Sequence, residues 1–152
     1  HVRSRRQRQM CIRDRVYAAR DISNAGVLGS LLMLLEATQS GADIDLQKIP
    51  KPQNVDWQTW LQIFPSYGFL LTADEGECEE IIELFESQGI CCAVIGESNA
   101  SGKVHVHDQK QSAQFWDFNQ QKFTGFNYVG ILKKLKAQSD PIEPIEKEAA
   151  YA

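Results

Sequence analysis

Four small or polar residues precede the longest apolar run of the chain, and their types suit the binding of an anion with its metal counter-ion. Asp21, Ser23, Asn24 and Gly26 stand immediately before this run. If the run is a helix, its first backbone N–H groups lack partners and carry the positive end of the helix dipole. A carboxylate and a hydroxyl at such an end are typical of sites that bind anions and the metal ions that accompany them.

Two other pairs of residues could contribute to a metal site. Asp43 and Asp45 share one face of a predicted strand, and His105 and His107 share one face of another. H-x-H can chelate a metal, but no third ligand stands at a suitable spacing from the histidines. We therefore favour a solvated strand face for both pairs.

The cysteines of the main part of the chain show no pattern of a zinc site or a disulfide framework. Cys78, Cys91 and Cys92 have no C-x-x-C spacing. Cys78 falls on the apolar face of a predicted helix, and the other two fall in an apolar run. We expect all three to be buried as small hydrophobic side chains, in a reducing, cytoplasmic compartment.

The apolar run predicts a long, largely buried helix over residues 24–40. Apolar residues recur at helical spacing, and Glu36 is the only charged residue within the run. Gly41 is expected to stop the helix. The stripe that should face the core consists of Leu28, Leu31, Leu32 and Leu35.

The remaining elements predict an α+β fold with a mixed β-sheet covered by helices. Two more helices are expected, a short one capped by Asp56 and another over residues 77–88. Because residues 90–95 are continuously apolar, we expect them to form a central strand, followed by a turn over 96–102. The other strands are predicted over residues 16–22, 42–46, 67–73, 103–108 and 114–118.

Charge divides the chain into two unlike parts. All seven arginines lie in the first 20 residues, whereas from Val16 onward ten basic residues face nineteen acidic ones, a net charge of −9. Residues 1–15 could be a nucleic-acid-binding arm, a targeting segment, a solvated and disordered basic tail or a non-native peptide. The non-native interpretation rests on their resemblance to a translated sequencing adapter. We favour the last interpretation and therefore expect no nucleic-acid partner. The sequence contains no run of 18 uncharged apolar residues, so it predicts no membrane-spanning helix.

The 152 residues are thus predicted to comprise the basic segment 1–15, one domain over 16–130 and a polar tail over 131–152. The domain has the length and the apolar content to bury its own core. If residues 1–15 are not native, the native chain starts inside a domain near Val16, with sequence missing upstream.

Residues 16–128 resemble the C-terminal domain of the AIR synthase (PurM-like) superfamily, and most closely its group of AIR synthase-related proteins. The resemblance rests on Asp21-Ile-Ser-Asn-Ala-Gly before a long helix and on Gly41-Ala-Asp-Ile-Asp-Leu after it. It continues in Tyr67-Gly-Phe-Leu-Leu-Thr, in Gly89-Ile-Cys-Cys-Ala-Val-Ile-Gly-Glu and in a closing aromatic–glycine turn. The superfamily includes thiamine-monophosphate kinase, selenophosphate synthetase and the hydrogenase maturation protein HypE.

The resemblance implies an ATP- and Mg²⁺-dependent enzyme that acts on a small molecule and is usually a homodimer. In this superfamily the nucleotide lies largely on a separate N-terminal domain, over which the C-terminal domain closes. We therefore expect the missing N-terminal domain to be the partner of this chain, and the chain to be inactive alone. No catalytic residue is assigned to it.

The thiamine-monophosphate kinase branch carries a D-x-S-D-G motif at the position of Asp21. By this likeness Asp21 and Asn24 are the implied Mg²⁺ ligands, and Ser23, Asn24 and Gly26 are the implied nucleotide contacts. Asn24 replaces an aspartate, so its amide oxygen could still bind Mg²⁺ but brings no charge.

A second departure from the kinase lies at Phe64-Pro65-Ser66, where the kinase has an acidic segment that meets its substrate. This difference argues against thiamine phosphate as the substrate. Together with Asn24, it leaves open a non-catalytic binding or regulatory module on the same fold.

Overall fold

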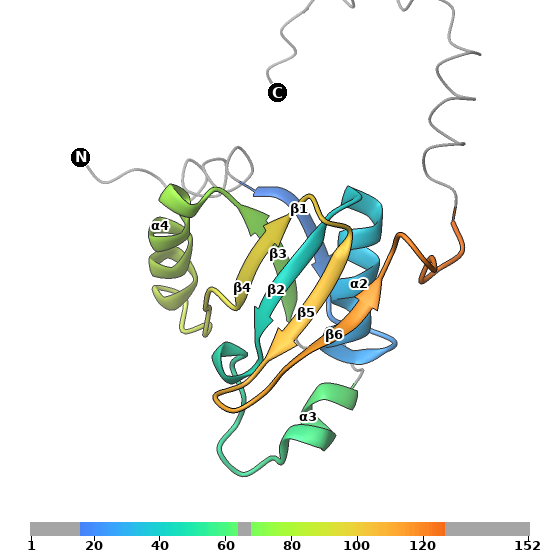
Figure 1. Ribbon diagram of the computed structural model, residues 1–152. Helices are drawn as coiled ribbons and strands as arrows, with labels where there is room; N and C mark the ends of the chain where they lie inside the picture. Colours follow the sequence, from blue (N-terminus) through green and yellow to red (C-terminus); the bar gives the residue numbers. More distant parts are fainter. Residues whose placement is uncertain (1–15, 64–67, 127–152) are drawn as a thin grey trace, which may run out of the picture.

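The computed structural model describes residues 16–63 and 68–126. In this part of the chain, the predicted alternation of helices and strands appears as six strands, three α-helices and a short 3₁₀ helix (Figure 1). The expectations for residues 1–15, for Phe64-Pro65-Ser66 and for the tail lie outside the described residues. The elements are β1 (Val16–Asp21), α2 (Gly26–Thr38), β2 (Gly41–Asp45), η1 (Leu46–Lys48), α3 (Trp57–Gln62), β3 (Phe69–Ala73), α4 (Glu75–Glu86), β4 (Gly96–Asn99), β5 (Lys103–His107) and β6 (Ser112–Asp117).

The strands form two sheets. A four-stranded mixed sheet has the order β4-β2-β5-β6, in which β2 pairs antiparallel with β4 and parallel with β5, and β5 pairs antiparallel with β6. Strands β1 and β3 form a separate antiparallel pair. The prediction of an α+β fold with a mixed sheet and helices is confirmed.

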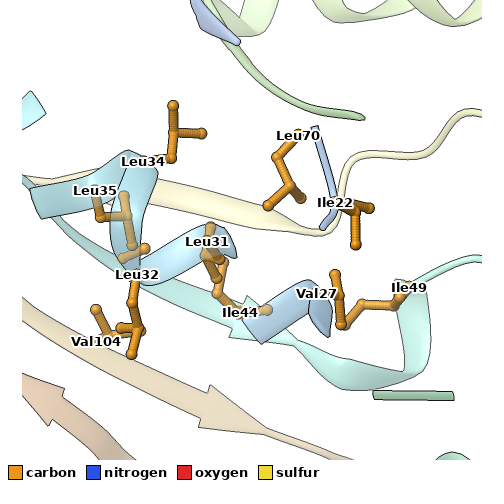
Figure 2. Packing of buried hydrophobic residues seen from close by; sticks show 11 residues of the cluster. Ile22, Val27, Leu31, Leu32, Leu34, Leu35, Ile44, Ile49, Leu70 and Val104 are labelled. Atoms are coloured by element: carbon orange, nitrogen blue, oxygen red, sulfur yellow. The ribbon is translucent and has the colours of Figure 1, made fainter. Parts of the chain in front are cut away.

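The core is organised around α2, as the leucine spacing predicts. Leu31, Leu32 and Leu35 are buried, and Leu28 is half-buried. Their cluster joins α2 to both sheets, and Figure 2 shows it together with side chains from β2, β3 and β5. Burying an aliphatic side chain contributes about 1.5–3 kcal/mol. The labelled residues are Ile22, Val27, Leu31, Leu32, Leu34, Leu35, Ile44, Ile49, Leu70 and Val104.

The end of α2 differs from its prediction. Gln39, with a φ of 56°, is the left-handed residue that terminates the helix, and the Ser40 N–H donates to the Leu35 carbonyl at 3.0 Å. Gly41 is instead the first residue of β2, so its prediction as the helix stop is wrong. A Cβ on Gly41 would lie 2.3 Å from the Lys103 carbonyl oxygen, so a glycine is needed where β2 meets β5.

The short helix α3 begins at the predicted cap. The Asp56 carboxylate accepts the backbone N–H of Thr59 at 2.9 Å and its hydroxyl at 2.6 Å. These charge-assisted bonds hold the pKa of Asp56 below its usual value. Trp57 and Trp60 pack against the core from this helix.

The prediction of a central strand over residues 90–95 is wrong. This segment has no strand assignment, and Ile90 and Val94 are 53% and 43% exposed. The strand forms at Gly96–Asn99 instead, where a turn was predicted. A Cβ on Gly96 would lie 2.1 Å from the Asp43 carbonyl oxygen, so close pairing with β2 requires the glycine rather than the apolar residues before it.

The cysteines are less buried than predicted because two of them belong to this misassigned segment. Cys91 is exposed, whereas Cys78 and Cys92 are half-buried. Burial is the main cause that raises the pKa of Cys92. All three are free thiols.

Among the described residues, no helix has the length and apolar character needed to cross a membrane.

Candidate functional site

The polar residues singled out in the sequence form a tight turn between β1 and α2. Strand β1 ends at Asp21, and the next backbone N–H, of Ile22, donates to the Gly68 carbonyl at 2.9 Å. The Gly26 N–H donates to the Ser23 carbonyl at 3.0 Å, which closes the turn. The Ser23 N–H donates to the hydroxyl of the fully buried Ser30 at 3.2 Å. The turn is therefore fixed to the first part of α2.

Helix α2 starts two residues later than predicted, at Gly26 rather than Asn24. Ala25 and Gly26 have φ values of 79° and 66°, in the left-handed region. A Cβ on Gly26 would lie 2.2 Å from the carbonyl oxygen of Leu61, so α3 approaches α2 closely at this point. Gly26 is thus buried under α3, and its predicted contact with a nucleotide remains a prediction.

The side chains of Asp21, Ser23 and Asn24 are not used to cap this helix. Ala25 occupies the cap position without a side-chain hydrogen bond, and the first turn holds no acidic residue. Asp21 and Ser23 are half-buried and Asn24 is exposed. None of the three side chains makes a hydrogen bond to another described residue. Within residues 16–63 and 68–126, their oxygens are therefore without hydrogen-bond donors at the positive end of a buried helix.

These oxygens suit a hard cation such as Mg²⁺ in type but not in number. Carboxylate, hydroxyl and amide oxygens are the donors that Mg²⁺ prefers. However, the described residues contain no group of three or more histidine, cysteine, aspartate or glutamate side chains placed to hold a metal. Within the described residues, Asp21 and its neighbours therefore offer too few ligands to hold a metal, and their role as Mg²⁺ ligands stays a prediction.

The histidines and aspartates of the four-stranded sheet form a polar strand face, as the sequence predicts. Asp43 pairs with His105 and Asp45 with His107 in the parallel register of β2 and β5. The Asp43 carboxylate lies 3.5 Å from His105 Nδ1 and accepts the Asn99 amide at 2.9 Å.

Asp45 makes a different contact and does not add a ligand to that pair. Its carboxylate accepts the Gln47 N–H at 2.9 Å and caps the 3₁₀ helix η1. Both aspartates of β2 therefore make contacts within the domain: Asp43 with Asn99 and His105, and Asp45 with the backbone of η1.

Strand pairing adds a residue to the site that sequence reasoning missed. Phe69 of β3 lies directly opposite Asp21 of β1, so both side chains lie on the same face of the pair. Phe69 is 66% exposed. Arg20 lies on the opposite face, where its Nη2 points to the Met33 sulfur at 3.0 Å and its buried Nε has no hydrogen-bond partner among the described residues. Only the register of β1 and β3 reveals this arrangement, and no sequence motif indicates it.

A second polar cluster lies near the C-terminal end of α2, and its carboxylate is engaged in hydrogen bonds within the fold. Glu36 is buried, and its carboxylate accepts the backbone N–H groups of Phe123 at 2.9 Å and Thr124 at 3.0 Å. It also accepts the Thr124 hydroxyl at 2.5 Å. Glu36 borders a surface cavity of about 240 Å³ together with Gln39, Asn119 and Lys122. Because its oxygens hold the 123–124 turn, Glu36 has a structural role.

The comparisons with known proteins agree with this fold. A family model described as the C-terminal domain of AIR synthase related proteins matches residues 3–109. The chain is 36% identical over 108 residues to an uncharacterized protein of Methanocaldococcus jannaschii, covering 71% of this chain and 33% of that protein. It is 35% identical over 109 residues to an uncharacterized protein of Synechocystis, covering 72% and 34%. The chain therefore spans about a third of the length of the curated relatives it matches.

Solved structures show the same fold at low sequence identity. A chain of the HypE–HypF complex matches with a TM-score of 0.61 and 19% identity, covering 73% of this chain and 39% of that chain. PurL of T. maritima complexed with FGAR matches with a TM-score of 0.60 and 18% identity, covering 69% and 18%. Other matching structures are PurL complexed with ATP and HypE in complex with ATP.

The match of the family model extends over most of the chain and agrees with the α+β fold built on the Asp21 turn and helix α2. The protein belongs to the family of AIR synthase related proteins, and residues 3–109 match that family's C-terminal domain.

Proposed function

We propose that this chain is the C-terminal domain of an ATP- and Mg²⁺-dependent enzyme that phosphorylates or activates a small molecule, and that it is inactive without the rest of that enzyme. The observation that carries the proposal is the turn between β1 and α2. It leaves the side chains of Asp21, Ser23 and Asn24 without hydrogen bonds to described residues at the N-terminal end of a buried helix.

In this proposal Asp21 and Asn24 are ligands of Mg²⁺, and Ser23 and Asn24 contact the nucleotide. When bound, Mg²⁺ would neutralise charge on the phosphate groups, which is the main requirement of phosphoryl transfer. Gly26 contributes by allowing the left-handed turn beneath Leu61, so that the turn keeps its shape. The turn supplies too few ligands alone, so the remaining ligands come from outside the described residues.

Two findings support a nucleotide site shared with another part of the protein. The matching HypE and PurL structures include complexes with ATP. The curated relatives are about three times as long as the matched region, which leaves room for an N-terminal nucleotide-binding domain. The proposal includes a homodimeric full-length enzyme in the cytoplasm, where the free thiols of this chain would stay reduced.

The alternative function is a non-catalytic binding or regulatory module on the same fold. It is favoured by Asn24, which gives the turn one carboxylate instead of the two expected from the kinase motif. A single carboxylate attracts Mg²⁺ more weakly than two. Such a module would bind a nucleotide or metabolite without turnover.

The test is Mg·ATP binding by the full-length protein, measured by calorimetry for the wild type and for Asp21→Asn. The matched control is Asp43→Asn, which removes the same charge from an exposed strand face. We expect Asp21→Asn to weaken Mg·ATP binding about tenfold or more, because charge-assisted contacts contribute about 1.5–3 kcal/mol. The control should bind as the wild type does.

Equal affinity in Asp21→Asn and the wild type would contradict the role of Asp21. Binding that depends on Asp21 but is never followed by ATP hydrolysis or phosphoryl transfer, across candidate small molecules, would favour the non-catalytic alternative.

A further inference from the structure

One face of the β1–β3 pair is open and apolar. Ala19 and Asp21 lie on one face of β1, opposite Leu71 and Phe69 of β3, and the exposed Tyr17 precedes them at an irregularity of the register between Val16 and Ala18. Opposite residues of an antiparallel pair lie on the same side of it. Together Tyr17, Ala19, Asp21, Phe69 and Leu71 form what we call the outer face.

The outer face exposes two large aromatic side chains. Tyr17 is 71% exposed and Phe69 is 66% exposed, while the inner face of the same strands packs with Ala18 and Leu70 on the core. The inner face thus gives the strand pair its packing on the core, which an isolated two-stranded sheet lacks. Exposed aromatic residues gathered on one face are typical of a surface that binds another protein surface.

The four-stranded sheet shows that an open face in this protein need not be apolar. Its open face carries Asp43, Glu97 and His105, and the Asn99 amide donates to the Asp43 carboxylate at 2.9 Å. Such side chains are well solvated by water. The outer face of β1–β3 differs in having only one charged residue, Asp21, among apolar ones.

The charges around the outer face argue against a second copy of this chain as its occupant. The Tyr17 hydroxyl donates to the Asp74 carboxylate at 2.5 Å, which places the acidic start of α4 beside the outer face. This hydrogen bond, with the charges of Asp74 and Glu77, raises the pKa of Tyr17. If two outer faces met across a twofold axis, the carboxylates of Asp21, Asp74 and Glu77 from both copies would be brought into one interface, and like charges would repel.

We propose that the outer face is the surface on which the rest of the full-length protein packs, and that this other part presents an apolar patch surrounded by basic residues that complement Asp21 and Asp74. The length of the curated relatives supplies such an occupant, because this chain matches only about a third of them. The inference rests on the proposed function in one respect: Asp21 then lies where the two parts meet, so that ligands from both can reach the same Mg²⁺.

The experiment is hydroxyl-radical footprinting of the full-length protein without nucleotide, with labelling of Tyr17, Phe69 and Phe115 compared in the same molecule. Phe115 of β6 is 40% exposed and serves as the internal reference. If the outer face is covered, Tyr17 and Phe69 should be labelled about tenfold more slowly than their exposures of 71% and 66% predict, while Phe115 is labelled at the rate its exposure predicts.

A matched pair of variants makes the test independent of the wild-type rates. Phe69→Ser in the full-length protein should weaken the packing and increase the labelling of Tyr17 several-fold. Phe115→Ser, which also removes an exposed phenylalanine, should leave Tyr17 labelling unchanged. Light scattering on the same samples tests for a second copy, since protection that appears only as the protein dimerises with rising concentration would overturn the inference.

Labelling of Tyr17 and Phe69 at their fully exposed rates in the full-length protein would also overturn the inference. Because the measurement uses no nucleotide, its failure is distinct from failure of the proposed function. Protection of the outer face with no effect of Asp21→Asn on Mg·ATP binding would reject only the nucleotide role. Full labelling with a strong effect of Asp21→Asn would reject only the docking surface.

Discussion

Glu36 and Thr124, 88 residues apart in the sequence, are joined through both the backbone and the side chain of the threonine. The Glu36 carboxylate accepts the N–H and the hydroxyl of Thr124 and also the N–H of Phe123. An acidic residue near the C-terminal end of a helix is disfavoured by the helix dipole. Its presence in the last turns of α2 is explained by these contacts, which fasten the segment after β6 to the central helix.

Glu36→Ala should destabilise the fold by about 3 kcal/mol, because it leaves buried N–H groups of the 123–124 turn without an acceptor. Glu36→Gln retains one carbonyl oxygen and should cost about half as much. Urea unfolding monitored by tryptophan fluorescence gives both free energies. The control is Glu83→Ala on the exposed face of α4, which should change stability by less than about 0.5 kcal/mol. Equal stabilities of Glu36→Ala and the control would show that the contact is not stabilising.

Gly26→Ala should destabilise the protein by about 2–4 kcal/mol, because Gly26 has a φ of 66° and a Cβ there would lie 2.2 Å from the Leu61 carbonyl oxygen. The matched control is Gly76→Ala in α4, where nothing lies within 4 Å of the added Cβ. Alanine is the better helix former, so the control should be neutral or stabilise by about 0.5 kcal/mol. Thermal unfolding of both variants provides the comparison, and similar melting temperatures would contradict the close approach of α3 to α2.

Asp56 should make the stability depend on pH in the acidic range. Its pKa lies below the usual value in the folded protein, chiefly because of the hydrogen bonds from Thr59. Its contribution is therefore fully present above the unfolded-state value of 3.8 and is lost as the pH falls through the lowered folded-state pKa. The difference in melting temperature between wild type and Asp56→Ala should be larger at pH 7 than at pH 2. Asp56→Asn retains an acceptor without titrating, so it should lose less stability at pH 7 than Asp56→Ala does; a difference independent of pH would reject this role.

Cys91 should react with a thiol reagent faster than Cys92. Cys91 is exposed, whereas burial raises the pKa of Cys92 and lowers its thiolate fraction. Iodoacetamide labelling at pH 8 followed by mass spectrometry should show a ratio of rates of about three or more. Equal rates would indicate that residues 90–95 are as buried as their apolar composition suggests.

The predictions that succeeded concern contacts close together in the sequence. Leucine spacing is enough to identify the buried side of α2, because a helix presents residues three and four apart on one face. The Asp56 cap was predictable for the same reason, since its partner Thr59 is three residues away. The alternating pairs Asp43 with Asp45 and His105 with His107 also indicated polar strand faces correctly.

The predictions that failed concern segments whose structure depends on close approach to the backbone of a distant segment. The apolar residues 90–95 resemble a buried strand, but the strand forms at Gly96, where an added Cβ would lie only 2.1 Å from the Asp43 carbonyl oxygen and only glycine fits. Gly41 resembles a helix stop, but its lack of a side chain is required where β2 meets β5. In both cases a glycine allows two strands that are distant in the sequence to lie close together. The spacing of residues within one segment cannot reveal such a contact.

The sequence by itself determined that this chain folds as an α+β domain around one buried helix, and that a carboxylate, a hydroxyl and an amide stand before that helix. These properties follow from composition and short-range periodicity. Only the tertiary structure decided that Phe69 lies opposite Asp21, that α3 covers Gly26, and that Glu36 holds Thr124. Each of these contacts joins residues far apart in the chain, and strand register and packing between elements, rather than local preference, bring them together.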